Sequence, residues 1–135
     1  MGAVHEVRMK VAFHDVDPLR IVWHGNYLKY FDVARFGLFA DRGIDLYAYL
    51  LAKGYAFPVT RSALKHIAPL LPFEEFVCRA AVTEAQYKIG MSFEIRKVGS
   101  GTLCARGTSE QLAVRHPSME MEFAIPDDIR QALGF

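Results

Sequence analysis

One apolar segment with helical spacing constrains the fold of this chain more than any other feature. Its apolar side chains recur at i, i+3, i+4, i+7 and i+11: Tyr27, Tyr30, Phe31, Ala34 and Leu38. This spacing forms one stripe of an α-helix, and Asn26 just ahead of it is the expected N-cap. Phe36, Phe39 and Ala40 widen the apolar surface. A helix this apolar must be largely wrapped by another element, and we expect that element to be a sheet.

Most of the remaining chain shows the two-residue alternation of β-strands. In residues 5–13, Val7, Met9, Val11 and Phe13 share one face while charged residues occupy the other. We predict five strands in total, over residues 5–13, 56–68, 75–85, 91–98 and 102–115. The segment Gly99-Ser100-Gly101 is the expected hairpin turn between the last two.

Two short helices complete the predicted elements, one from Asp45 to Lys53 that ends at Gly54 and one over Asp127–Leu133 behind Pro126. A strand, a long helix and then four strands joined mainly by turns pack most economically as one antiparallel sheet around one helix. We therefore predict an α+β fold and a single domain over residues 1–135. Such a sheet leaves an edge and apolar faces uncovered, so we also predict a homodimer or homotetramer.

Composition excludes several classes of protein. The chain has 135 residues, 52% of them hydrophobic, and a formal net charge of +1, which excludes a disordered chain and a general nucleic-acid binder. The sequence has neither an apolar run as long as a membrane span nor an apolar signal core, so we expect a cytoplasmic protein. Cys78 and Cys104 are expected to be reduced core thiols. Because no Asp, Glu, His or Cys cluster has metal spacing, we expect no metal or other cofactor.

The densest group of chemically capable side chains lies in residues 14–27, between the first strand and the long helix. A helix start offers unpaired backbone amides and a positive dipole end, which stabilise an anion or a developing oxyanion. Asp15 and Asp17 precede it and could supply a base or a nucleophile. The alternative is that these carboxylates only order the loop, as Asp commonly does.

This segment resembles a known family. The pattern Asp-x-Asp-Pro-x-x-Ile-Val-Trp-x-x-Asn-Tyr before an aromatic helix is similar to that of hot-dog-fold thioesterases of the 4-hydroxybenzoyl-CoA thioesterase type. The matching residues are Asp15, Asp17, Pro18, Ile21, Val22, Trp23, Asn26 and Tyr27. The related small acyl-CoA thioesterases of the Tol-Pal-associated kind have a histidine at the place of His24. The predicted order of elements agrees with this family along nearly the whole chain.

The resemblance implies roles for individual residues. Asp17 corresponds to the catalytic carboxylate, which acts as a nucleophile or as a general base on water. The backbone amide of His24 corresponds to the donor to the thioester carbonyl; its side chain either orients water or substrate or only packs on Trp23. The candidates for substrate binding are Asp15, Arg20, Trp23, Asn26 and Tyr27.

Two positions depart from the family pattern, which often has glycine at Arg20 and a small residue at Leu19. A long cation in this loop could narrow the acyl pocket or contact a carboxylate or phosphate, so the aromatic substrate of the name-giving enzyme is not carried over. The phosphates of coenzyme A would need basic side chains. Arg61, Lys65 and Lys88 are the candidates, with solvated surface charge as the alternative.

Together, the residues and the resemblance predict hydrolysis of an acyl thioester carried on coenzyme A or an acyl carrier protein. Thiolate is a good leaving group, so the reaction needs no strong acid. Two alternatives stay open. One is a hot-dog dehydratase of hydroxyacyl thioesters, for which Asp32 on the helix would supply a carboxylate. The other is a non-catalytic module that binds acyl thioesters.

Overall fold

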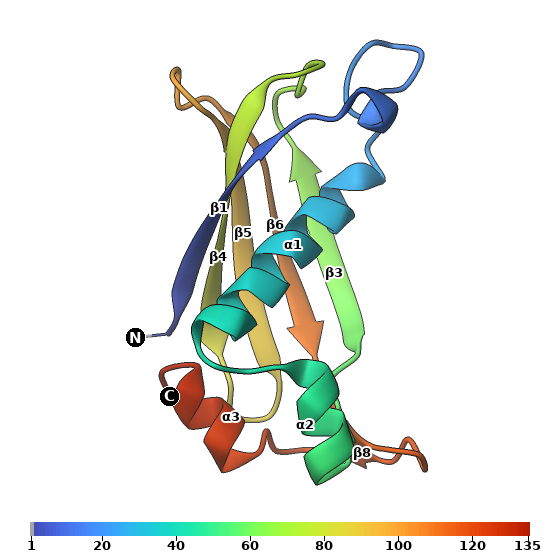
Figure 1. Ribbon diagram of the computed structural model, residues 1–135, viewed down its shortest axis with the longest axis vertical. Helices are drawn as coiled ribbons and strands as arrows, with labels where there is room; N and C mark the ends of the chain where they lie inside the picture. The colour runs from blue at the N-terminus through green and yellow to red at the C-terminus, as the bar shows by residue number, and fades with distance from the viewer. Residues whose placement is uncertain (1) are drawn as a thin grey trace.

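A five-stranded antiparallel sheet with one long helix across it forms the body of the protein (Figure 1). The structure is a computed structural model and describes residues 2–135. The strands lie in the order β1 (Val4–Lys10), β4 (Glu75–Glu84), β5 (Ile89–Lys97), β6 (Leu103–Gln111) and β3 (Val59–His66). Helix α1 (Asn26–Asp41) follows β1 and packs on one face of this sheet. The predicted α+β architecture is confirmed.

The face of the sheet toward α1 forms the core because alternate residues of each strand point the same way. Along β4 and β5 these residues are fully buried: Phe76, Cys78, Ala80, Met91, Phe93 and Ile95. The rings of Phe31 and Phe93 stack with centroids 4.6 Å apart. A Cβ at Gly107 would lie 2.6 Å from the Phe31 ring, so this glycine lets the helix approach β6 closely.

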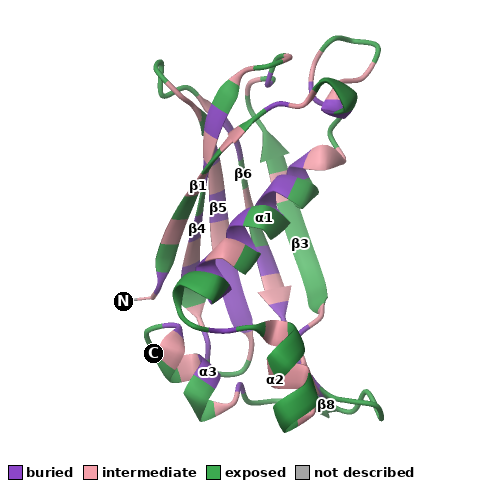
Figure 2. Ribbon diagram, in the orientation of Figure 1, coloured by how far each residue is buried: buried purple, intermediate pink, exposed green. Residues whose placement is uncertain are grey.

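Helix α1 buries the stripe that the sequence predicts, from Tyr27 to Leu38, together with Phe39. Phe36 and Ala40, however, are exposed, because the sheet covers only one side of the helix (Figure 2). Arg35 is instead buried on the covered side. It pairs with Asp32 and donates to Ser109 Oγ at 2.7 Å, which supplies hydrogen bonds for a charge in the core.

The two longest predicted strands are each broken in two. A separate small sheet contains β2 (Tyr55–Ala56), β7 (Ala113–Arg115) and β8 (Met121–Glu122). Phe57-Pro58 separates β2 from β3, since proline cannot donate to a strand ladder, and Leu112 separates β6 from β7. The first strand is also shorter than predicted, because residues Phe13–Asp15 form a 3-10 turn.

The short helices agree with the sequence prediction. Helix α2 (Leu46–Lys53) is capped by the Asp45 side chain, which accepts from the Ala48 amide at 3.0 Å, and ends at Gly54 with φ of 75°. Helix α3 (Asp127–Ala132) follows Pro126. No helix within residues 2–135 is long and apolar enough to cross a membrane.

Candidate active site

The loop between β1 and α1 folds back on itself as a tight turn. The Asp17 amide donates to the Ile21 carbonyl at 3.0 Å, and the Arg20 amide donates to the Asp17 carbonyl at 2.9 Å. The Leu19 amide donates to Asp17 Oδ1 at 2.8 Å, which is the turn-ordering bond common for Asp. Within residues 2–135, Asp17 Oδ2 has no hydrogen-bond or ion-pair partner. One carboxylate oxygen thus holds the turn, and the other is available for a reaction.

Asp15 anchors the base of this loop to α1. It is 5% exposed, and its carboxylate accepts from Lys29 Nζ at 2.6 Å and from Tyr30 Oη at 2.8 Å. Burial acts to raise the pKa of Asp15, but the hydrogen bonds from Lys29 and Tyr30 outweigh it and hold the pKa below its ordinary value. The Tyr30 pKa is raised, mainly by burial and in addition by its hydrogen bond to Asp15. Asp15 is therefore an ionised structural anchor.

The first turn of α1 leaves two backbone amides free. The Trp23, Asn26 and Tyr27 amides donate to backbone carbonyls, whereas those of His24 and Gly25 have no acceptor within residues 2–135. Gly25, not Asn26, is the N-cap. Asn26 is the first helical residue, and its side chain donates to the Asp15 carbonyl at 2.9 Å. The predicted cap was therefore wrong, because Asn26 is used to hold the loop.

Gly25 leaves room at the helix start for the close approach of an aromatic ring. A Cβ at this position would lie 2.3 Å from the Trp23 ring. The Trp23 ring also packs on the His24 ring, with centroids 5.2 Å apart. The indole therefore covers the glycine, and both amides stay at the end of the helix dipole, where a negatively charged oxygen is stabilised.

A cavity of about 340 Å³ opens beside this helix start. Two segments line it, one from the loop and helix start and one that follows β3: Asp17, Leu19, Ile21, Val22, His24, Tyr27, His66, Ile67, Ala68 and Pro69. The His66 ring lies edge-on to Tyr27 with centroids 4.8 Å apart, and its centroid is 6.4 Å from that of His24. The cavity is mostly apolar, with a carboxylate and two imidazoles on its walls.

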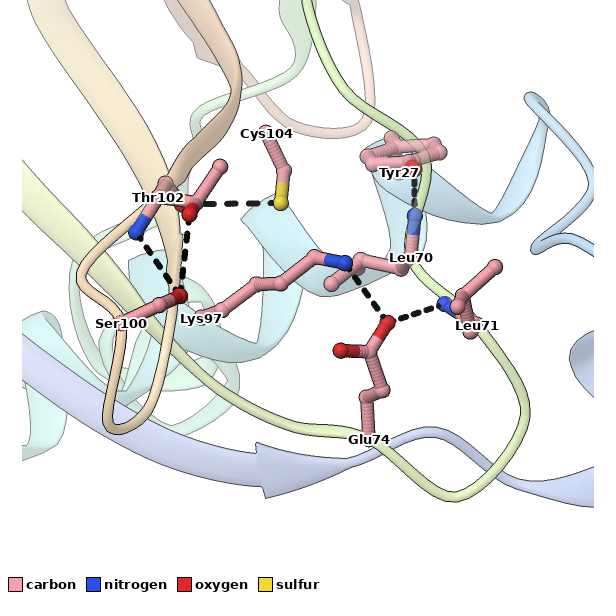
Figure 3. A network of polar contacts seen from close by, with 8 residues as sticks. All are labelled: Tyr27, Leu70, Leu71, Glu74, Lys97, Ser100, Thr102 and Cys104. Atoms are coloured by element: carbon pink, nitrogen blue, oxygen red, sulfur yellow. Dashed lines mark hydrogen bonds and ion pairs between the residues drawn. The ribbon is translucent and has the colours of Figure 1, made fainter.

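The wall after β3 is held by a polar network (Figure 3). The Leu70 amide donates to the Tyr27 hydroxyl at 3.4 Å, and the Leu71 amide donates to Glu74 Oε1 at 2.7 Å. Lys97 Nζ donates to the same Glu74 oxygen at 2.9 Å. Burial raises the pKa of Tyr27, so its hydroxyl stays protonated. These bonds fix the wall against α1 and the sheet.

The two cysteines are structural. The Cys104 carbonyl accepts from the amides of Ile67 and Ala68 at 2.8 and 3.0 Å, which fixes the same wall. Both thiols are free and buried. Burial raises the pKa of the Cys78 thiol to about 12 and also raises that of Cys104. Neither thiol has the thiolate character of a nucleophile.

The structure brings together only part of the predicted site. Asp17, His24 and Tyr27 line one cavity. Arg20 and Trp23 are exposed and lie outside its lining, and Asp15 and Asn26 lie beneath the loop. His66 also lines the cavity, although it belongs to no motif in the sequence. Its only sequence signal was its position at the end of a predicted strand.

The basic candidates lie on the outer face of the sheet. Lys65 lines a shallow cavity of about 350 Å³ together with Arg106, its cross-strand neighbour. Lys88 Nζ donates to Glu110 at 2.9 Å, and this bond raises the Lys88 pKa. Arg61 lines a further cavity with Lys88 and Glu110. Arg106 was missed because only the strand register places it beside Lys65.

The described chain offers no preformed metal site. Across residues 2–135, no three His, Cys, Asp or Glu side chains gather closely enough to hold a metal ion. Asp32, the carboxylate considered for a dehydratase, pairs with Arg35 and lies outside the cavity lining.

Comparison with known proteins places this geometry in a family. The family described as the thioesterase-like superfamily matches residues 11–133. The chain is 27% identical over 128 residues to YneP of Bacillus subtilis (strain 168), named as a candidate acyl-CoA thioesterase. That alignment covers 92% of this chain and 91% of YneP.

Solved structures share the fold. A 1,4-dihydroxy-2-naphthoyl-CoA thioesterase from Synechocystis superposes with a TM-score of 0.89 at 16% identity, covering 96% of this chain and 95% of that one. The 4-hydroxybenzoyl CoA thioesterase from Pseudomonas sp. strain CBS-3 gives a TM-score of 0.86 at 15% identity, covering 96% and 99%. The hot-dog fold suggested by the sequence is confirmed.

Proposed function

The chain belongs to the thioesterase-like superfamily and is a thioester hydrolase, and we propose that it hydrolyses acyl thioesters of coenzyme A with Asp17 as the reacting carboxylate. The observation that carries this proposal is that the two carboxylate oxygens of Asp17 have different surroundings. Oδ1 accepts from the Leu19 amide, while Oδ2 has no partner within residues 2–135 and Asp17 lines the cavity. A carboxylate held this way is positioned to attack a carbonyl carbon or to take a proton from water.

The helix start supplies the second element of the reaction. Among residues 2–135 the His24 amide has no acceptor, and His24 lines the cavity at the beginning of α1, so a thioester carbonyl in the cavity can accept from this amide. As the carbonyl carbon becomes tetrahedral its oxygen gains negative charge, and both the amide and the helix dipole stabilise that charge more than the ground state. Leu19, Ile21 and Val22 provide the apolar surface for the acyl group.

The phosphates of coenzyme A are proposed to bind the exposed cations on the outer face of the sheet. Lys65 and Arg106 are neighbours across β3 and β6, and two adjacent cations favour an anion between them. Arg61 is a further candidate for phosphate contact, whereas Lys88 is already paired with Glu110. The proposed reaction uses protein groups alone and needs no metal or redox cofactor.

The proposal includes a homo-oligomeric assembly and a location in the cytoplasm. Strand β3 lies at an edge of the sheet and is exposed along almost its whole length. Helix α1 exposes the apolar side chains of Leu28, Val33 and Phe36. Exposed strand edges and apolar faces favour pairing with a second copy. The buried, unpaired thiols fit a reducing compartment. Sedimentation is expected to show a dimer or tetramer at micromolar concentration, and a compact monomer would contradict this.

A panel of acyl thioesters tests the function. Short, long and aryl acyl groups, each on coenzyme A and on an acyl carrier protein, are incubated with the protein and a thiol-trapping dye. We expect thiol release from the acyl-CoA substrates, unaffected by a chelator. Loss of water without thiol release would instead show the dehydratase, and binding without either reaction would show a non-catalytic module.

A further inference from the structure

His66 contributes a titratable side chain to the cavity that the proposed reaction does not use. It ends β3 and lines the same cavity as Asp17. The imidazole packs edge-on against the Tyr27 ring, at 4.8 Å between centroids. Tyr27 is 3% exposed and accepts from the Leu70 amide. The His66 ring therefore rests on a buried side chain, while His66 itself is exposed and lines the cavity.

Hydrolysis through a covalent acyl-enzyme needs a base other than Asp17. In the first step Asp17 Oδ2 attacks the thioester carbon, the C–S bond breaks, and the thiolate leaves with the electron pair. Asp17 is then part of a mixed anhydride and can no longer accept a proton. Water must lose a proton as it attacks this anhydride, so another group has to take it.

We propose that His66 is the general base of this second step, an inference that rests on the proposed function. Water attacks the acyl carbon and its proton passes to the neutral imidazole. The bond between the acyl carbon and the Asp17 oxygen then breaks, which restores the Asp17 carboxylate. The product acid and His66 each release a proton to solvent. Histidine suits this role because its ordinary pKa lies near neutrality.

The geometry favours His66 over His24. The His24 ring packs on Trp23 and lies on the same segment as Asp17. The helix start is assigned to the carbonyl oxygen, and His66 lines the same cavity from the separate segment at the end of β3, so its ring is the one left for the attacking water. The titratable groups that face His66 in the cavity are Asp17, His24 and Tyr27.

The test is pre-steady-state thiol release by the full chain carrying His66→Phe, which keeps a ring against Tyr27 and removes the base. The best acyl-CoA of the panel is mixed rapidly with the variant and the thiol-trapping dye. We expect a burst of one thiol per active site at the wild-type rate, followed by turnover slower by roughly 10²–10⁴-fold. Hydroxylamine added after the burst is expected to capture the acyl group as a hydroxamate.

Two further variants complete the experiment. His66→Gln also removes the base, and a burst with this variant supports the proposal if His66→Phe does not fold. His116→Gln is the matched control, because His116 is exposed and lies between β7 and β8, away from the cavity. It is expected to behave as wild type.

The outcomes separate this inference from the proposed function. Turnover of the folded His66 variants within about tenfold of wild type overturns the role of His66, since a positioned base contributes more. Slow thiol release from the first turnover, without a burst, overturns it as well. In both cases wild-type hydrolysis still supports the proposed function. A wild-type protein that releases no thiol from any thioester overturns the proposed function itself.

Discussion

Asp15 and Asp17 are two carboxylates separated by one residue, and they occupy opposite environments. Asp15 is buried beneath the loop, where Lys29 and Tyr30 donate to it. Asp17 lines the cavity, where the Leu19 amide holds one of its oxygens. The 3-10 turn at Phe13–Asp15 and the bridge between Val16 and Val22 separate the two environments.

This difference shows how one short loop serves both the fold and the reaction. A carboxylate whose oxygens are both bonded in the folded protein stabilises the loop but is not free to react. A carboxylate with one bonded oxygen is oriented and still has a free one. We therefore expect substitutions at Asp15 to change stability mainly, and substitutions at Asp17 to change activity mainly.

The largest expected effect is the loss of hydrolysis rate in the Asp17→Asn variant. The Asn side chain keeps an oxygen that accepts from the Leu19 amide, so the turn remains, but the charge and basicity are lost. We expect kcat to fall by roughly 10²–10⁴-fold or more, with little change in KM or Tm. Thiol-release kinetics and thermal melting measure both.

Two results would contradict this assignment. If Asp17→Asn hydrolyses its best thioester within about tenfold of the wild-type rate, the loss is too small for removal of a nucleophile or base. A large fall in Tm with a proportionate loss of activity would instead show that Asp17, like Asp15, mainly orders the loop.

Asp15→Asn is expected to show the reverse pattern. The ion pair with Lys29 is lost and the Tyr30 hydroxyl loses a charged acceptor, so we expect a loss of roughly 1–3 kcal/mol in the free energy of unfolding. The effect is limited because Lys29 is half-exposed and its charge is screened. The fall in kcat should be milder than for Asp17→Asn. Urea unfolding measures the loss. Asp41→Asn is the control, because Asp41 is an exposed carboxylate at the end of α1.

The stability difference between wild type and Asp15→Asn is expected to depend on pH. The pKa of Asp15 in the folded protein lies below its ordinary value of 3.8. The ionised form therefore stabilises the fold above about pH 4, and this contribution is lost as the pH falls through the lowered pKa. Urea unfolding of both proteins from pH 7 to pH 2 measures the difference. A gap that widens on acidification would contradict the role of Asp15 as an ionised anchor.

The smallest expected effect on stability is that of Arg20→Gly, at the tip of the same loop. Arg20 has φ of 63°, a left-handed conformation that glycine adopts without strain. We expect the free energy of unfolding to change by at most about 1 kcal/mol, in the stabilising direction. If Arg20 also selects the substrate, the ranking of acyl groups should change more than the best rate. Equal slowing of all substrates would contradict that selection.

The sequence by itself determined the elements whose cause is local. The stripe from Tyr27 to Leu38 has helical spacing, and it is buried in the structure. The cap at Asp45 and the left-handed Gly54 also follow from short-range chemistry. The motif containing Asp17 could be found because its residues are close along the chain, so a resemblance preserves their spacing.

Only the tertiary structure decided which side chains meet. His66 lies 39 residues after Tyr27 in the sequence, yet their rings pack because β3 ends beside the start of α1. Arg106 lies next to Lys65 only through the register of β6 on β3. Asn26 is a residue type that commonly caps helices, but its side-chain amide donates to the Asp15 carbonyl instead. In each case the deciding contact joins residues that are not neighbours in one helix or strand, and packing, which local patterns do not specify, brings them together.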